Sequence, residues 1–206
     1  MLKNKIALVT GAGSGIGEAV AQLFASNGAS VVLADTDTEG AERVLARIEK
    51  DGGKGMVVKT DVSKPDECAR LVSETTTRFS RLDIAVNNAG IGGPSALTGD
   101  YPLDGWEKVI AINLSGVFYG MRYQIPAMLK NGGGSIINMA SILGKVGFPM
   151  SSAYASAKHG VIGLTETSAC EYATQGIRVN AVGPGFIQTP LLDKNLNAEQ
   201  LKGIAA

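Results

Sequence analysis

Six short apolar segments constrain the fold of this 206-residue chain more than any other feature of its sequence. Each is five or six residues long, is rich in valine, isoleucine or alanine, and is bounded by polar residues or glycine. Apolar side chains on both faces are typical of strands in a parallel sheet that helices cover on both sides. We therefore expect buried parallel strands at residues 5–10, 30–34, 55–60, 83–87, 134–139 and 177–182.

The stretches between these segments have helical periodicity, with apolar residues three and four positions apart. Ser63 is placed to cap a helix that begins at Lys64, and Asp104 and Glu107 have the spacing of a capping box before a long helix. Alternating strands and helices predict an α/β fold with a doubly wound, Rossmann-type parallel sheet and helices on both faces. We expect residues 1–206 to form a single domain.

The composition excludes several classes of function. Lysine plus arginine and aspartate plus glutamate both number 19, so no charge excess favours nucleic acid or an anionic membrane as a partner. No run of about 18 apolar residues is long enough to span a bilayer. With one histidine, His159, and two distant cysteines, Cys68 and Cys170, we expect no metal site and two buried thiols in a reducing cytoplasm.

A glycine-rich loop follows the first expected strand. Gly11, Gly15 and Gly17 lie in the segment TGAGSGIG, with Ser14 and Ile16 between them. Glycines at such a turn let the backbone approach a pyrophosphate, which then rests on the positive N-terminus of the next helix. Glycine can also be needed there for packing alone, so the loop by itself leaves both explanations open.

Asp35 follows the second expected strand, near the ~20-residue offset at which a carboxylate can bind an adenosine ribose 2′-hydroxyl. This carboxylate would repel a 2′-phosphate, and the neighbouring Thr36 and Ser14 carry no positive charge to offset the repulsion. The alternative is that Asp35 only caps the second helix. We predict NAD as the cofactor, in preference to NADP.

Tyr154 and Lys158 are four residues apart in an expected helix, so their side chains share one face. A cation within ~4–6 Å lowers a tyrosine pKa from its usual ~10, which suits a group that exchanges protons with an alcohol. Ser141, just after the fifth expected strand, can donate a hydrogen bond to a substrate oxygen. The alternatives are a surface tyrosine packed along a lysine stem and a serine that stabilises a turn.

Asn113 interrupts an apolar stretch that we expect to be helical, and a buried amide needs hydrogen-bond partners. It could hold a water molecule that links to Lys158, or it could bond to its own backbone. The local sequence favours neither explanation.

Polar or functional positions lie at or near the carboxyl ends of all six expected strands. In a parallel sheet these ends meet at one edge, where ligands of open α/β sheets bind. Chance explains one or two such placements, but not six. The positions are Thr10, Asp35, Asp61, Asn87, Ser141 and Val182.

In combination, these motifs resemble the short-chain dehydrogenase/reductase family, over essentially the whole chain. Compact members of that family share the spacing of the glycine loop, which differs in the sugar-nucleotide epimerases. The matching residues are Thr10-Gly11-xxx-Gly15-x-Gly17, Asp61-Val62, Asn87-Asn88-Ala89-Gly90, Asn113, Ser141, Tyr154-xxx-Lys158 and Pro184-Gly185.

The resemblance implies roles for these residues. The glycine loop would hold the pyrophosphate, Asp35 the adenosine ribose, and Asp61 and Val62 the adenine. The catalytic residues that it implies are Asn113, as part of a proton relay, Ser141, Tyr154 as the acid/base, and Lys158. The cofactor-binding residues that it implies are Gly11, Ser14, Gly15, Ile16, Gly17, Asp35, Asp61, Val62, Asn87, Ala89, Gly90, Tyr154, Lys158, Pro184, Gly185, Ile187 and Thr189.

The resemblance also implies an NAD-dependent oxidoreductase that moves a hydride between nicotinamide and a secondary alcohol or ketone. We expect a homodimer or homotetramer, with the helices near 104–130 and 151–174 packed against a partner subunit. A non-catalytic dinucleotide sensor is the alternative, but it would not need all four catalytic residues. Reduction of an acyl-carrier thioester would normally use NADPH, and the Asp35 carboxylate disfavours NADPH because it would repel the 2′-phosphate.

The substrate stays open among steroids, small diols, cyclic alcohols and sugars. The family's chain usually continues through a further helix and a seventh strand. This sequence stops at Ala206, so we expect the substrate-loop region from about residue 186 onward to be incomplete. An apolar pocket is expected from Ile91, Gly93, Ile142, Leu143, Gly147, Phe148 and Phe186.

Overall fold

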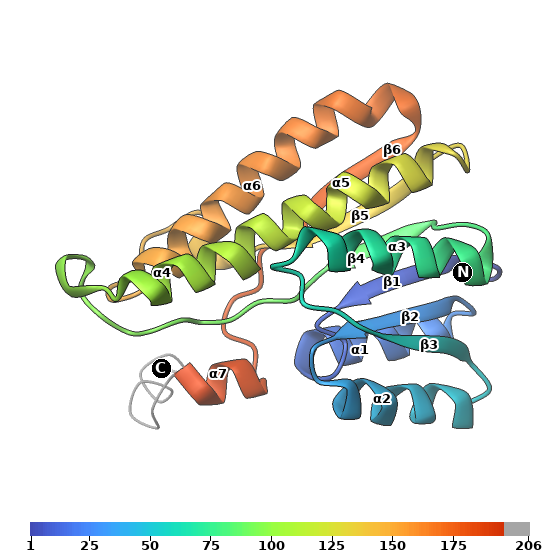
Figure 1. Ribbon diagram of the computed structural model, residues 1–206, viewed down its shortest axis with the longest axis horizontal. Coiled ribbons are helices and arrows are strands. Elements are labelled where there is room, and N and C mark those ends of the chain that lie inside the picture. The colour runs from blue at the N-terminus through green and yellow to red at the C-terminus, as the bar shows by residue number, and fades with distance from the viewer. Residues whose placement is uncertain (196–206) are drawn as a thin grey trace.

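A parallel six-stranded sheet lies between two layers of helices in the computed structural model, which describes residues 1–195 (Figure 1). The strand order is β3-β2-β1-β4-β5-β6. Successive strands are added on one side of β1 up to β3 and on its other side from β4 onward, as in the predicted doubly wound fold. Each expected strand is present, with bounds shifted by at most one residue. The strands are β1 Ile6–Thr10, β2 Ser30–Asp35, β3 Lys54–Lys59, β4 Ile84–Asn87, β5 Gly134–Met139 and β6 Ile177–Val182.

Helices cover both faces of this sheet. On one face lie α1 Gly15–Ser26 and α2 Thr38–Lys50, and on the other lie α3 Pro65–Phe79, α5 Gly116–Leu129 and α6 Ser152–Tyr172 (Figure 1). The helix α4 Leu103–Ile110 continues into α5 through a π-helical turn, Ala111–Ser115, and α7 Pro190–Asn195 follows β6. Within the described part of the chain, no helix has the length and apolarity needed to cross a membrane.

Alternate residues of the central strands point into the two helix layers. In β1, Ala7 and Val9 belong to the core beneath α1 and α2, whereas Leu8 belongs to the core beneath α3 and α5. All three side chains are fully buried. Because both faces of the central strands are covered, these strands appear in the sequence as continuous apolar segments. The expectation of a buried strand is wrong for the edge strand β6, where Arg178, Asn180, Ala181 and Val182 are exposed.

Two helix starts differ from the sequence prediction. The helix α3 begins at Pro65, and Ser63 does not cap it. The helix α4 begins one residue before Asp104, directly after Pro102, and no side chain caps it. In both places a proline sets φ near its value in a first helical turn, so the chain enters the helix without the predicted side-chain caps.

The two cysteines lie in different environments. Cys68 is buried in α3, whereas Cys170 is exposed near the end of α6, so the prediction of two buried thiols is wrong for Cys170. Among residues 1–195, no cluster of three or more histidine, cysteine, aspartate or glutamate side chains could hold a metal ion.

Candidate active site

The glycine loop between β1 and α1 is braced by two side chains from neighbouring strands. The Gly13 N–H donates to Asp35 Oδ2 at 2.8 Å. The Asn88 Nδ2 donates to the carbonyl oxygens of Thr10 and Gly11, at 2.9 and 3.2 Å. The loop is therefore tied to the ends of both β2 and β4.

The start of α1, which follows directly from the loop, has no side-chain cap. Ser14 occupies the N-cap position of α1 but makes no capping bond with its side chain, and the first N–H groups of a helix have no intrahelical partner. A Cβ on Gly17 would overlap the Gly11 carbonyl oxygen, so close packing requires glycine at that position whatever binds there. Gly15 has a φ of +57°, and a Cβ there would lie 3.4 Å from Thr189. Thr189, in the segment after β6, therefore lies close to the loop.

Asp35 does not cap α2. The cap is Asp37, whose Oδ1 accepts the Gly40 N–H at 3.0 Å. Asp35 instead accepts N–H groups from Gly13 and from Asp37, one on each carboxylate oxygen. The capping explanation for Asp35 is therefore wrong, and its remaining lone pairs can accept bonds from a ligand.

Arg43 is a loop neighbour that the sequence reasoning missed. Its guanidinium donates to the Gly13 carbonyl oxygen at 2.8 Å and pairs with Glu18 at 3.3 Å. Arg47 pairs with the same carboxylate at 2.9 Å. A cation therefore lies close to the loop, contrary to the expectation, although its charge is shared with Glu18.

The Asn87 side chain points into the core. Its Nδ2 donates to Gln124 Oε1 at 3.1 Å and to Asn138 Oδ1 at 2.9 Å, and the residue is 4% exposed. Only its backbone is left for the expected ribose path. The next residue, Asn88, lines the cavity that Ser141, Tyr154 and Lys158 also border, and the sequence reasoning did not single it out as a site residue.

Asn113 lies in the π-helical turn and is fully buried. Its Oδ1 accepts the Ile91 N–H at 2.9 Å, and its Nδ2 donates to the Ile91 carbonyl oxygen at 2.8 Å. The explanation that this amide serves its own backbone is wrong, because it holds the segment after β4 against the long helix. Such π-helical turns occur often at functional sites.

Ser141, Tyr154 and Lys158 meet on one wall of a cavity. The Lys158 Nζ donates to the Met139 carbonyl oxygen at 2.6 Å and lies 5.6 Å from the centre of the Tyr154 ring. Ser141 Oγ accepts the Leu143 N–H at 3.2 Å, which is the turn bond considered as its alternative role. The same hydroxyl also interacts with the Tyr154 phenol.

Burial controls the protonation of these groups. It raises the pKa of Tyr154 above the usual 10.0, and the hydrogen bond with Ser141 offsets part of this rise. Burial also lowers the pKa of Lys158 from 10.5 to about 8. The expected lowering of the Tyr154 pKa is therefore not present in the protein alone, because desolvation of the phenolate outweighs the favourable interactions.

We expect Lys158 to make the free energy of unfolding depend on pH. Between the folded pKa of about 8 and the unfolded value near 10.5, the unfolded chain binds more protons, so stability rises with pH across this window. The difference in unfolding free energy, wild type minus Lys158→Met, should increase by about 2 kcal/mol from pH 7 to pH 9.5. Urea unfolding at both pH values measures this difference in free energy. A difference that stays constant with pH would contradict the lowered pKa of Lys158.

The cavity beside these residues has a volume of about 420 Å³. Phe148 and Phe186, from the loops before α6 and after β6, both line it and meet edge-to-face with ring centres 6.3 Å apart.

The cavity is lined by five of the expected pocket residues, Gly93, Ile142, Leu143, Phe148 and Phe186, but not by Ile91 or Gly147. Of the expected cofactor residues, it is lined by Ile16, Gly90, Tyr154, Lys158, Pro184, Gly185, Ile187 and Thr189. The expected substrate-loop region beyond residue 195 lies outside the described residues.

Known proteins share this sequence and architecture. The family model described as short chain dehydrogenase matches residues 5–200. Cyclohexanol dehydrogenase from Acinetobacter sp. (strain SE19) is 46% identical over 199 residues, covering 97% of this chain and 79% of that protein. Cis-4-hydroxycyclohexanecarboxylate dehydrogenase from Sinomonas cyclohexanicum is 44% identical over 189 residues, covering 92% and 76%. The crystal structure of an NAD+-bound xylitol dehydrogenase matches with a TM-score of 0.88 and 35% identity, covering 90% of this chain and 71% of that one. The chain belongs to the short-chain dehydrogenase family.

Proposed function

We propose that this oxidoreductase uses NAD to interconvert a cyclic secondary alcohol and its ketone. The observation that carries the proposal is the meeting of Ser141, Tyr154 and Lys158 on the wall of a cavity with apolar residues around it. The two relatives named as dehydrogenases of cyclohexanol and of a hydroxycyclohexanecarboxylate support a six-membered ring as the substrate. A non-catalytic sensor is not favoured, because these relatives are dehydrogenases.

The described residues fit a dinucleotide. The start of α1, which no side chain caps, suits a pyrophosphate, and the cavity is lined both by Ile16 in the glycine-loop segment and by Tyr154. NAD, when bound, would supply a nicotinamide ring that accepts the hydride from the carbinol carbon. We assign the pyrophosphate to Gly11, Ser14, Gly15, Ile16 and Gly17, the adenosine to Asp35, Asp61 and Val62, and the nicotinamide half to Asn87, Ala89, Gly90, Pro184, Gly185, Ile187 and Thr189.

Asp35 favours NAD over NADP. Two backbone N–H groups hold its carboxylate at the end of β2, beside the glycine loop, where it would repel a 2′-phosphate. Arg43 is the nearby cation, but it already donates to the Gly13 carbonyl oxygen and pairs with Glu18. A relative of known structure binds NAD+, which agrees with this assignment.

Each polar side chain of this site would have a separate role in proton transfer. Ser141 would orient the substrate hydroxyl, and the Tyr154 oxygen would take its proton as the carbon–hydrogen bond breaks. Lys158, when charged, would bind the nicotinamide ribose and favour the phenolate form of Tyr154. Asn113 would act indirectly, by positioning other residues. Its amide holds the Ile91 backbone, and with it the segment that borders the cavity.

We also propose a homodimer or homotetramer that forms through α4, α5 and α6. Leu103 and Trp106 on α4 are 80% and 39% exposed, and Phe118 on α5 is 48% exposed. Apolar side chains gathered on one continuous helix are typical of a subunit contact. A cytoplasmic location is part of the proposal, because Cys68 and Cys170 both carry free thiols.

Initial rates of dinucleotide reduction test the reaction, the substrate and the cofactor together. With NAD, kcat/KM for cyclohexanol should exceed the values for 2-hexanol and xylitol by about tenfold or more, since a misfit of the size of one methylene in a hydrophobic pocket costs about 1–3 kcal/mol. NADP should support a lower rate with each alcohol. Faster turnover of xylitol would overturn the cyclic substrate, and equal rates with NADP would overturn the role of Asp35.

A further inference from the structure

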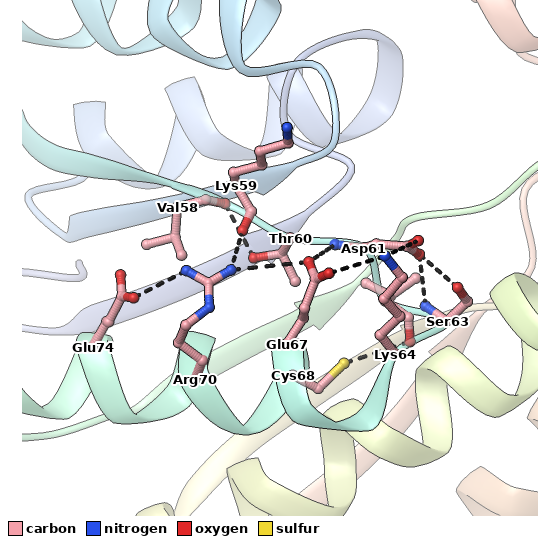
Figure 2. A network of polar contacts seen from close by, with 11 residues as sticks. Val58, Lys59, Thr60, Asp61, Ser63, Lys64, Glu67, Cys68, Arg70 and Glu74 are labelled. Atoms are coloured by element: carbon pink, nitrogen blue, oxygen red, sulfur yellow. Dashed lines mark hydrogen bonds and ion pairs between the residues drawn. The ribbon is translucent and has the colours of Figure 1, made fainter.

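Asp61, just after β3, is held by the residues that follow it (Figure 2). Its backbone N–H donates to Glu67 Oε2, in the first turn of α3, at 2.8 Å. Ser63 donates twice to Asp61 Oδ1, from its N–H at 3.0 Å and from its hydroxyl at 2.7 Å. Both the backbone and the carboxylate of Asp61 are therefore held in place.

The other carboxylate oxygen of Asp61, Oδ2, is held less closely, by one ion pair. Oδ2 lies 3.7 Å from Lys64 Nζ, which is an ion-pair distance but too long for a hydrogen bond. The Asp61 side chain is 33% exposed, and the residue follows the carboxyl end of β3, at the edge of the sheet where the expected cofactor residues lie. Oδ2 can therefore accept a hydrogen bond from a ligand N–H group.

Glu67 is itself anchored at both ends of its carboxylate. Oε1 pairs with Lys64 at 3.3 Å, and Oε2 lies 3.9 Å from Arg70. Arg70 donates to the Lys59 carbonyl oxygen at 2.6 Å, which ties α3 to the last residue of β3 (Figure 2). Hydrogen bonds from Ser63 and from the Asp61 backbone lower the pKa values of Asp61 and Glu67, so both are anions at neutral pH.

We infer that Ser63 and Glu67 are positioning residues that make the cofactor site specific for adenine. Ser63 occupies Oδ1 of Asp61, and Glu67 holds the backbone N–H of Asp61. Asp61 Oδ2 is then the oxygen that accepts a hydrogen bond from the adenine 6-amino group. A 6-oxo purine places an oxygen against this carboxylate and is rejected, because two acceptors repel each other. The inference rests on the proposed function, which assigns Asp61 to the adenine.

Fluorescence titration with NADH and with reduced nicotinamide hypoxanthine dinucleotide, its 6-oxo analogue, tests this inference. The ratio of the two dissociation constants should be about tenfold or more in the wild-type protein, because a hydrogen bond to a charged group is lost. Ser63→Ala and Glu67→Ala should lower that ratio to about twofold. Glu67→Gln keeps an oxygen for the Asp61 N–H and should retain the ratio. Asp61→Asn should favour the analogue, since its amide can donate to the 6-oxo group.

Glu74→Ala is the matched control, because Glu74 pairs with Arg70 at 3.0 Å but does not contact Asp61. It should keep the wild-type ratio, and reduced nicotinamide mononucleotide, which lacks adenosine, should bind all variants equally. NADH binding with an unchanged ratio in Ser63→Ala and Glu67→Ala would overturn the inference alone. A wild-type protein that binds NADH and its analogue equally would also overturn it. Failure of the wild-type protein to bind NADH would overturn the proposed function, and the inference with it.

Discussion

Replacing Tyr154 with phenylalanine should lower kcat by about 10²–10⁴-fold, which is the usual contribution of a well-placed general acid or base. The variant loses only the hydroxyl, while the ring keeps its packing against the small buried cluster of Val109, Ala153 and Ala157. The dissociation constant of NADH should change little, because the glycine loop and Asp35 are untouched. Absorbance of NADH measures the rate, and fluorescence titration measures the binding.

Tyr101→Phe is the matched control for this prediction. Its hydroxyl oxygen is also buried, and it has no hydrogen-bond partner among the residues that the structure describes. Removing it should leave kcat unchanged and should not lower the thermal midpoint, because an unpaired buried polar atom only costs stability. A Tyr154→Phe protein that turned over at the wild-type rate would contradict the assignment of Tyr154 as the acid/base.

The features of the fold that depend on local pattern could be predicted from the sequence. Strands covered on both faces, such as β1 and β2, produce continuous apolar segments. The bounds of all six strands could be predicted to within one residue. Because parallel strands share one direction, their carboxyl ends had to meet, and this placed Asp35 and Ser141 at the same edge. The helical spacing of Tyr154 and Lys158 likewise placed both side chains on one face.

The partners of buried polar side chains could not be predicted, because they depend on contacts between distant parts of the chain. Asn113 bonds to Ile91, which is 22 residues away, and Arg43 bonds to Gly13, which is 30 residues away. Sequence periodicity shows that such residues lie on a helix, but not which neighbouring backbone the helix will meet. The rise in the pKa of Tyr154 could not be predicted for the same reason, since the burial of a phenol depends on the packed structure.

The amide network around Asn87 shows what such long-range contacts contribute to stability. Gln124, on α5, is fully buried, and its Nε2 donates to Asn87 Oδ1 at 2.8 Å while its Oε1 accepts from Asn87 Nδ2. Asn87 also donates to Asn138 on β5, and Asn138 donates to Thr165 on α6 at 2.9 Å. These four side chains join β4 and β5 to the helices that cover them, so each polar atom depends on its neighbour.

Replacing Gln124 with leucine should therefore lower the free energy of unfolding by about 1–3 kcal/mol. Leucine is of similar size and suits an apolar core, so the loss comes from Asn87 Oδ1, which is left buried without its donor. Urea unfolding measures the free energy, and the thermal midpoint should fall by about 2–4 °C for each kcal/mol lost. Gln175→Leu makes the same change at an exposed position and should leave both values almost unchanged. Equal stability of Gln124→Leu and wild type would mean that Asn87 finds another donor, and that this amide pair does not hold β4 to α5.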